Sequence, residues 1–446
     1  MAPAVQGFFG NGGGRAYIAR ILGKGATCAS VRLAPDDAEG AISFEARTPG
    51  AWGNRLGVRI MRGTRAGIRV SIYEMRLDRS EGGELGQPLE DFDNLALDTQ
   101  GPNFALQVIN ENSRWVSCST MNLRYASSPK TILAVLVGGT DGAPLDAADY
   151  CGEPSSLPEQ GTGLSGLANL DDVALLCVPD HVHPGMRAED REKIAKETVA
   201  QCERLQDRFA LLSVEGGQSD LAAIRPIVDT AFAALYHPWI CVEEPTLKRD
   251  IWIPSMGHVA GIFARCDLVQ GVHRSPADQE VRGLSREGER GSVEFSLTAD
   301  DLDTLERLGV NAICDLGKAR GVRVTSALTM SIDAQQRSIG ARRFVSFVQD
   351  SILRGTRWAE FEINDERLWA SIADQIQTFL KSLWESGALL GSEPAEAFFV
   401  RCDRSTMTQV DIDNGRVIIL IGLSLAEPGA VVTRAITIQT TRPGMK

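Results

Sequence analysis

The sequence lacks any apolar run long enough to cross a membrane. No window of about 18 consecutive apolar residues, the length that a spanning helix needs, occurs anywhere in the chain. The N-terminal segment also lacks the positively charged stretch followed by an apolar stretch that marks a secretory signal. These absences argue against membrane insertion and against secretion.

Cysteine pairs and runs of basic residues are missing as well. The nine cysteines are spread singly, with no Cys-x-x-Cys spacing, so neither a disulfide framework nor a zinc ribbon is indicated. Such cysteines are typical of reduced core residues in a protein made in a cytosol. The formal charge is −12, and the 46 Lys and Arg residues form no long run. Because nucleic-acid binding needs clustered positive charge, we predict no nucleic-acid partner.

The common catalytic motifs HExxH and GxSxG and a complete Walker A are absent too. The stretch GFFGNGGGRAYIARI, residues 7–21, is the candidate for a phosphate loop. Such a loop needs a strand, then the glycine turn, then a helix. Here the order is reversed, because residues 4–9 are typical of a helix end and residues 16–21 of a strand. We expect residues 11–14 to form a helix C-cap and turn with Gly or Asn in the left-handed conformation, and we predict no cofactor.

One polar loop supports an enzymatic alternative. The sequence PDHVHPG places Asp180, His181 and His183 at the end of a predicted parallel strand, where α/β sheets often bind ligands. An α/β hydrolase-like or metal-binding enzyme that uses this loop is the alternative function. No third His or Cys has matching ligand spacing, and Glu243 and Glu244 would point in opposite directions on a strand. We therefore predict no catalytic and no metal-binding residues, and a protein that is not an enzyme.

Apolar patterning predicts a multidomain protein of mixed α/β and α+β class. Short apolar runs bounded by Gly, Pro and Asn indicate a β-rich domain over residues 40–140. Its expected strands are GAISFEART (40–48), NRLGVRIMR (54–62), AGIRVSIYEMRL (66–77), FALQVIN (104–110) and SRWVSCST (113–120). The Gly, Pro and Ser content of residues 141–166 then indicates a linker.

Strands alternate with helices over residues 167–333. We expect strands at 173–180, 209–216, 239–245, 310–316 and 321–331, and helices at 191–206, 219–235 and 254–271. The strands are continuous apolar runs, which is typical of strands buried on both faces. This segment therefore predicts a parallel sheet with helices on either side.

Residues 334–446 predict a C-terminal α+β domain. Helices are expected at 334–356 and at 365–386, the second with Asn364 or Asp365 as its N-cap, an apolar face at helical spacing and Gly387 just past its end. Strands are expected at AFFVRCD (397–403), GRVIILIGLSLAEP (415–428) and VVTRAITIQTT (431–441). Alternation in the last strand places Ile436 and Ile438 on one face. A terminal strand of this kind either pairs within its own domain or leaves to complete the sheet of a neighbour.

Nine sequence stretches, in order along residues 4–440, resemble the tail sheath proteins of contractile phage tails, R-type bacteriocins and extracellular injection particles. They are VQGFFGNGGGRAYIARI, ARTPGAWGNRLGVRI, DFDNLALD, VINENSRWV, GVHRSPADQEVRG, LGVNAI, GVRVTSALTMS, INDERLWASIADQIQTFLKSLWESGALLG and AFFVRCDRSTMTQVDIDNGRV. The motif set is closer to the extracellular injection particles than to phage.

The resemblance implies a structural subunit that stacks in rings around an inner tube and contracts to drive that tube through a target envelope. Its implied partners are other copies of itself, the inner tube protein, and baseplate and cap proteins. It implies assembly in the bacterial cytoplasm and a place in a phage tail or phage tail-like particle. It also implies that residues 1–33 and 167–333 belong to a core with a subtilisin-like fold, into which the β-rich domain is inserted. No catalytic triad is carried over with that fold.

The resemblance further implies that terminal arms link subunits by strand exchange. The residues expected to exchange are Val431, Val432, Thr433, Arg434, Ala435, Ile436, Thr437, Ile438, Gln439 and Thr440. The family's leading N-terminal arm has no counterpart before MAPAVQGFF, so either the start is trimmed or the mesh is built differently. On helix 365–386, the polar residues Glu366, Asp374 and Lys381 either face the tube or are simply solvated.

Overall fold

The structure of the chain is a computed structural model. It describes residues 2–33, 38–39, 41–75, 87–97, 103–121, 124–125, 131–155, 161–244, 248–285, 291–426 and 431–440. Contacts divide the chain into two compact units, Met1–Ala19 with Cys151–Lys446, and Arg20–Tyr150. The predicted boundary at residue 33 differs from this division, because strand β1 (Ser30–Leu33) pairs with β3 (Ile42–Ala46) inside the second unit. Among the described helices, none is long and apolar enough to span a membrane.

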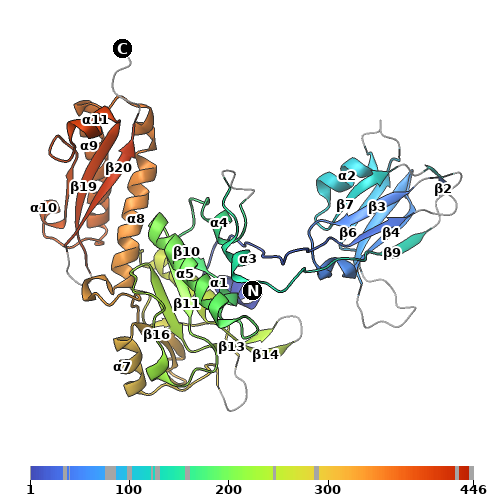
Figure 1. The fold of residues 1–446 in the computed structure, drawn as a ribbon, viewed down its shortest axis with the longest axis horizontal. Helices are drawn as coiled ribbons and strands as arrows, with labels where there is room; N and C mark the ends of the chain where they lie inside the picture. The colour runs from blue at the N-terminus through green and yellow to red at the C-terminus, as the bar shows by residue number, and fades with distance from the viewer. Residues whose placement is uncertain are drawn as a thin grey trace. The chain divides into compact units, whose positions relative to one another are not determined.

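The unit Arg20–Tyr150 is built mainly from two antiparallel sheets, of order β1-β3-β7 and β6-β5-β4-β9 (Figure 1). Its remaining elements are β2 (Ala38–Glu39), η1 (Ala51–Arg55), β4 (Leu56–Arg62), β5 (Ile68–Glu74), β6 (Glu90–Leu95), α2 (Ala105–Asn112), β7 (Val116–Met121), β8 (Arg124–Tyr125), β9 (Ile132–Val135) and α3 (Ala147–Cys151). The predicted strand at 104–110 is wrong, since these residues form α2. Its buried residues, Ala105 and Ile109, are four apart, so they share one face of a helix.

The larger unit contains a six-stranded sheet of order β10-β11-β12-β16-β17-β15. The first four strands are parallel, as predicted, and the last two are antiparallel. The elements are α1 (Ala2–Gly10), α4 (Gly163–Leu167), β10 (Leu175–Cys177), η3 (Pro179–Val182), α5 (Ala188–Leu205), β11 (Phe209–Ser213), η4 (Leu221–Ala223), β12 (Ala233–His237), β13 (Ile240–Glu244), β14 (Arg249–Ile253), α6 (Met256–Val269), β15 (Gln279–Glu280), α7 (Ala299–Arg307), β16 (Val310–Asp315) and β17 (Val322–Val324).

Three expectations for this unit are wrong. The helix predicted at 219–235 does not form, because it would place Pro226 in a helix interior. The last residues of this segment belong instead to the fully buried strand β12. The strand at 239–245 is β13, which forms a hairpin with β14 rather than joining the parallel sheet. Residues 16–21 form no strand. Residues 156–160 of the predicted linker and residue 245 lie outside the described residues.

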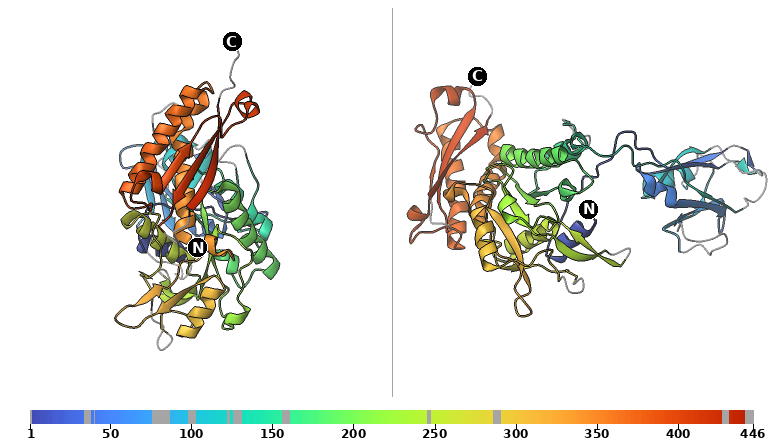
Figure 2. Two further views of the ribbon diagram at one scale, coloured as in Figure 1. Left: turned by 90° about the vertical axis from the view of Figure 1, so that its left-hand side faces the viewer. Right: turned by 60° about the horizontal axis from the view of Figure 1, so that its bottom comes forward.

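The C-terminal part of this unit is an α+β layer in which helices lie beside a three-stranded antiparallel sheet (Figures 1 and 2). Its elements are η5 (Ala334–Gln336), α8 (Ile339–Gly355), η6 (Arg357–Phe361), α9 (Glu366–Glu385), α10 (Pro394–Ala397), β18 (Phe398–Arg401), α11 (Gln409–Asp413), β19 (Arg416–Ser424) and β20 (Val431–Gln439). Helix α9 begins where predicted, because the Asp365 carboxylate accepts from the amides of Arg367 and Leu368.

Candidate functional site

The last strand, β20, lies at the edge of the C-terminal sheet, whose order is β18-β19-β20. It pairs with β19 over nine residues, from Ser424 opposite Val431 to Arg416 opposite Gln439. Among the described strands, β19 is its one neighbour, so the other edge of β20 presents its backbone groups without a strand partner. In the free chain, the segment predicted to exchange is therefore held in its own sheet with one edge open.

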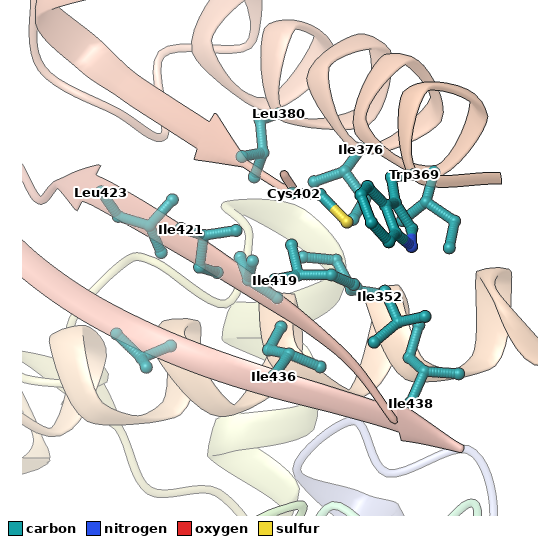
Figure 3. Close-up of a cluster of buried hydrophobic side chains, with 14 of the residues drawn as sticks. Ile352, Trp369, Ile376, Leu380, Cys402, Ile419, Ile421, Leu423, Ile436 and Ile438 are labelled. Atoms are coloured by element: carbon teal, nitrogen blue, oxygen red, sulfur yellow. The ribbon is translucent and has the colours of Figure 1, made fainter. Parts of the chain in front are cut away.

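One face of β20 anchors it to the domain core. Ile436 and Ile438 are 2% and 6% exposed, whereas Thr437 and Gln439 between and beyond them are exposed, which confirms the predicted alternation. The two isoleucines join a cluster that includes Ile352 of α8, Trp369 of α9 and Ile419 of β19 (Figure 3). Burying an Ile side chain stabilises the fold by about 1.5–3 kcal/mol, so the pair fixes the register of the strand.

The far end of β20 is fastened by a turn. The Thr440 amide and hydroxyl both donate to the Gly415 carbonyl, at 2.7 and 2.9 Å. The Gln439 side-chain amide donates to the Asn414 carbonyl at 2.8 Å. By contrast, Val431 at the other end is 70% exposed. The strand is thus held most firmly at its C-terminal end.

The three residues predicted on the polar face of α9 are all exposed there, but they do not form one cluster. Glu366 accepts from Arg404 Nε at 2.9 Å, near the start of the helix. Asp374 and Lys381 line a shallow groove of about 410 Å³ shared with Phe398 and Val400 of β18. The structure therefore brings Asp374 and Lys381 together and leaves Glu366 apart.

The two imidazoles in the loop of the enzymatic alternative lie in different environments. His181 is buried, its Nδ1–H donates to the Val178 carbonyl at 2.7 Å, and burial lowers its pKa to about 4. His183 is exposed and accepts from the Gly185 amide at 3.1 Å. No group of three or more His, Cys, Asp or Glu side chains suited to a metal occurs within the described part of the chain. One imidazole of the loop is thus a core group, and the other closes a turn.

The glycine-rich stretch follows helix α1 and contains a buried asparagine. Helix α1 ends at Gly10, as predicted, and Gly12 has a φ of 113°, the region that favours glycine. Asn11 is fully buried: its side-chain amide donates to the Gly7 and Arg282 carbonyls, and its side-chain oxygen accepts from the Arg282 amide. The stretch thus ties α1 to residues far along the chain.

Residues 331–439 match the family described as phage tail sheath C-terminal domain, which is the part of the chain that contains α8, α9 and the sheet with β20. The resemblance to tail sheath proteins is confirmed. We call residues 331–439 the sheath domain from here on.

Relatives extend the similarity beyond the sheath domain. A putative prophage major tail sheath protein of Pseudomonas aeruginosa is 25% identical over 287 residues, covering 63% of this chain and 71% of that protein. The tail sheath protein of Vibrio phage KVP40 is 24% identical over 195 residues, covering 43% of this chain and 27% of that protein. The chain thus spans only about a quarter of the length of the Vibrio phage protein.

Solved structures show the same likeness. The sheath of an extracellular contractile injection system, PVC, in its contracted state has a TM-score of 0.50 and 27% identity, over 62% of this chain and 72% of that chain. A sheath tail protein from Listeria innocua has a TM-score of 0.60 over 94% of this chain and 82% of that chain, at 12% identity, which shows the fold alone. These relatives and neighbours are sheath proteins; none of their names supports the enzymatic alternative.

A pair of arginines on α8 and β20 was not predicted from the sequence. Arg342 of α8 is buried, and Arg434 of β20 lies on the same inward face as Ile436. The sequence signal for this pair was Arg342–Arg343 near the start of a helix whose first turn has no acidic residue. Acidic residues are favoured at that end of a helix, because it carries the positive end of the helix dipole.

Proposed function

We propose that the chain is a structural sheath subunit that polymerises around an inner tube and contracts to drive the tube through a target envelope. The observation that carries this proposal is the sheath domain, with its terminal strand on an open sheet edge. The proposed partners are other copies of the chain, the inner tube protein, and baseplate and cap proteins, with no enzymatic role. The proposed site of assembly is the bacterial cytoplasm, and the proposed destination is a phage tail or tail-like particle.

The proposal includes a finer description of the fold. The parallel strands β10, β11, β12 and β16 with their helices support a subtilisin-like core. The division of the chain supports an inserted domain, since Arg20–Tyr150 lies between two segments of the larger unit. On α9, the exposed Asp374 and Lys381 are the proposed contacts to the tube, with Glu366 as a third.

Exchange of residues 431–440 between subunits is the proposed link. Every backbone hydrogen bond that β20 makes with its own β19 can be made in the same way with β19 of another copy. A swap therefore costs little free energy once the local concentration of subunits is high. The same swap would carry Ile436 and Ile438 into an identical cluster of the acceptor. The open edge of β20 offers a further set of backbone groups to a neighbouring strand.

A cysteine pair across β19 and β20 tests the exchange. Leu420 and Ala435 are opposite each other, and both lie on the outer face of the sheet. Opposite residues of antiparallel strands have Cα atoms about 4.5–5.5 Å apart, which a disulfide can bridge. In assembled particles of L420C/A435C, exchange predicts disulfides between chains and a covalent ladder on a non-reducing gel.

The free subunit and the single variants are the controls for this experiment. The free L420C/A435C subunit should form the disulfide within one chain, and neither single variant should give the ladder. Intrachain disulfides in assembled particles as well would refute the exchange while leaving the sheath role intact.

Electron microscopy tests the sheath role itself. The purified chain, with and without its tube protein, should form rings, tubes or contracted cylinders in negative stain. A monomeric binding module would instead remain small by light scattering at high concentration, and that outcome would rule out the proposal. Pre-incubation with a metal chelator should leave the assemblies unchanged.

The proposed source of energy is conformational. A metastable extended array that gains contacts on contracting needs no nucleotide, because the difference in free energy is shared over many subunits. We expect the contracted array to bury more surface between subunits, per chain, than the extended array. Maps of both states would decide this, and equal buried areas would contradict it.

A further inference from the structure

Arg342 is a buried arginine without a carboxylate partner among the described residues. It lies in the first turns of α8 and is 8% exposed. Its guanidinium lies over the Phe232 ring, with the Cζ atom 4.5 Å from the ring centroid, and one of its terminal nitrogens is 3.4 Å from the Ser346 hydroxyl. Its Nε has no hydrogen-bond partner in the part of the chain that the structure describes. Burying a charge in this way costs several kcal/mol unless an opposite charge accompanies it.

The charged group that acts on Arg342 is another arginine. Helix α8 contacts β20, where Arg434 is half-buried on the inward face, two residues before Ile436. Burial and then the Arg434 charge lower the pKa of Arg342 to about 10, so the Arg342 side chain stays positive at neutral pH. Neither arginine forms an ion pair with any described residue.

The next residue, Arg343, is also a buried arginine, but it has a carboxylate partner. Arg343 Nη1 donates to Asp267 Oδ1 at 2.8 Å, and its second terminal nitrogen donates to the other carboxylate oxygen. Its guanidinium also lies over an aromatic ring, that of Phe263, at 4.9 Å. Arg342 and Arg343 therefore have the same aromatic support, but a carboxylate is present for only one of them in the described chain.

We propose that Arg342 and Arg434 form a carboxylate-binding site that an Asp or Glu side chain of a second copy of this chain occupies in the assembly. Two guanidinium groups and the positive end of the α8 dipole match one carboxylate in charge and hydrogen-bonding capacity. A second copy is the occupant because Arg434 lies on the strand through which subunits are proposed to join. The chain also carries 58 acidic against 46 basic residues, so acidic side chains are available. This inference rests on the proposed sheath function.

The site predicts opposite effects on the free subunit and on the assembly. Replacing Arg342 by Met removes an uncompensated buried charge, so the melting temperature of the free subunit should stay level or rise by about 2–4 °C. The same change should raise the concentration needed for assembly about tenfold or more, because a charge-assisted pair is lost. Arg434→Gln should weaken assembly similarly, and Arg434→Lys should restore part of it.

The matched control is Arg343→Met, which breaks a pair within the chain and should lower the melting temperature of the free subunit. If Arg342→Met lowers it as much, Arg342 has a partner in its own chain and the inference is wrong. Glu427→Gln tests an acidic residue that lies outside the described residues. If Glu427→Gln lowers the melting temperature of the free subunit as much as Arg343→Met does, the carboxylate comes from the same chain, which also overturns the inference.

Further outcomes separate the inference from the proposed function. If the wild type forms sheath-like particles and both R342M and R434Q form them at the same concentration, the inference fails and the sheath role stands. If the wild type forms none, the sheath role fails first. If inorganic phosphate raises the melting temperature of the wild type but not of R342M, and assembly is unchanged, a small anion fills the site and the inference is overturned.

Discussion

Replacing Asn11 by Ala should release the N-terminal helix α1 from the core. The Asn11 side chain makes hydrogen bonds of 2.9 and 3.1 Å to the Gly7 and Arg282 carbonyls and accepts one of 2.9 Å from the Arg282 amide. The Gly7 carbonyl keeps a bond from the Asn11 backbone amide at 3.1 Å, so the groups left unsatisfied are the two on Arg282. These two groups are only partly buried, so each costs about 1–2 kcal/mol when it is unsatisfied, and the expected loss is about 2–4 kcal/mol.

Hydrogen exchange of the whole chain measures this loss where it occurs. A loss of about 2–4 kcal/mol predicts amide exchange about 30- to 1000-fold faster in α1 and in the α6 turns packed on it. Asn414→Ala is the matched control, since its side-chain amide also donates to a carbonyl four residues earlier, at 2.8 Å, but at an exposed site. Exchange in α1 should be unchanged in that variant. A change of less than about threefold in the Asn11 variant would refute this account of the N-terminal clamp.

Two further predictions concern the stability of the larger unit. Ile436→Ala removes a side chain that is 2% exposed, and it should lower the free energy of unfolding by about 2–5 kcal/mol. Thr437→Ala, on the exposed face of the same strand, should change it by no more than about 0.5 kcal/mol. Equal effects of the two variants in denaturant titrations would contradict the assignment of Ile436 to the buried face of β20. Burial lowers the pKa of His181 from 6.5 to about 4, so the unfolded chain binds the proton more readily and stability should fall as the pH drops from about 6.5 toward 4. Unfolding titrations over that range should show a shallower decline for His181→Gln, and an equal decline would mean that His181 is not the group responsible.

Local signals in the sequence predicted several elements correctly. Helix α9 was expected at 365–386 and lies at Glu366–Glu385, because its apolar period, the Asp365 cap and Gly387 all act within a few residues. The inward face of β20 was also predicted, since alternation depends only on the pleat of the strand. The family resemblance rested on nine ordered stretches and was confirmed, whereas the exchange of β20 stays a prediction.

The wrong predictions concern segments whose apolar pattern fits both a helix and a strand. Residues 219–235 were expected to be a helix, but they end in β12, because a strand buried on both faces and a buried helix have the same apolar content. The same ambiguity made α2 look like a strand. Which solution forms depends on the neighbours available in space, here β11 and β16 on either side of β12.

The sequence by itself determined the period of each amphipathic element, the caps of its helices, and the absence of common catalytic and metal-ligand motifs, because these depend on residues adjacent in the chain. Only the tertiary structure decided that Asn11 binds the backbone of Arg282, that β20 lies at the edge of its sheet, and that α8, which carries Arg342, packs against β20, which carries Arg434. Those pairings join distant segments, and their partners are selected by packing and by the burial of charge rather than by any local pattern.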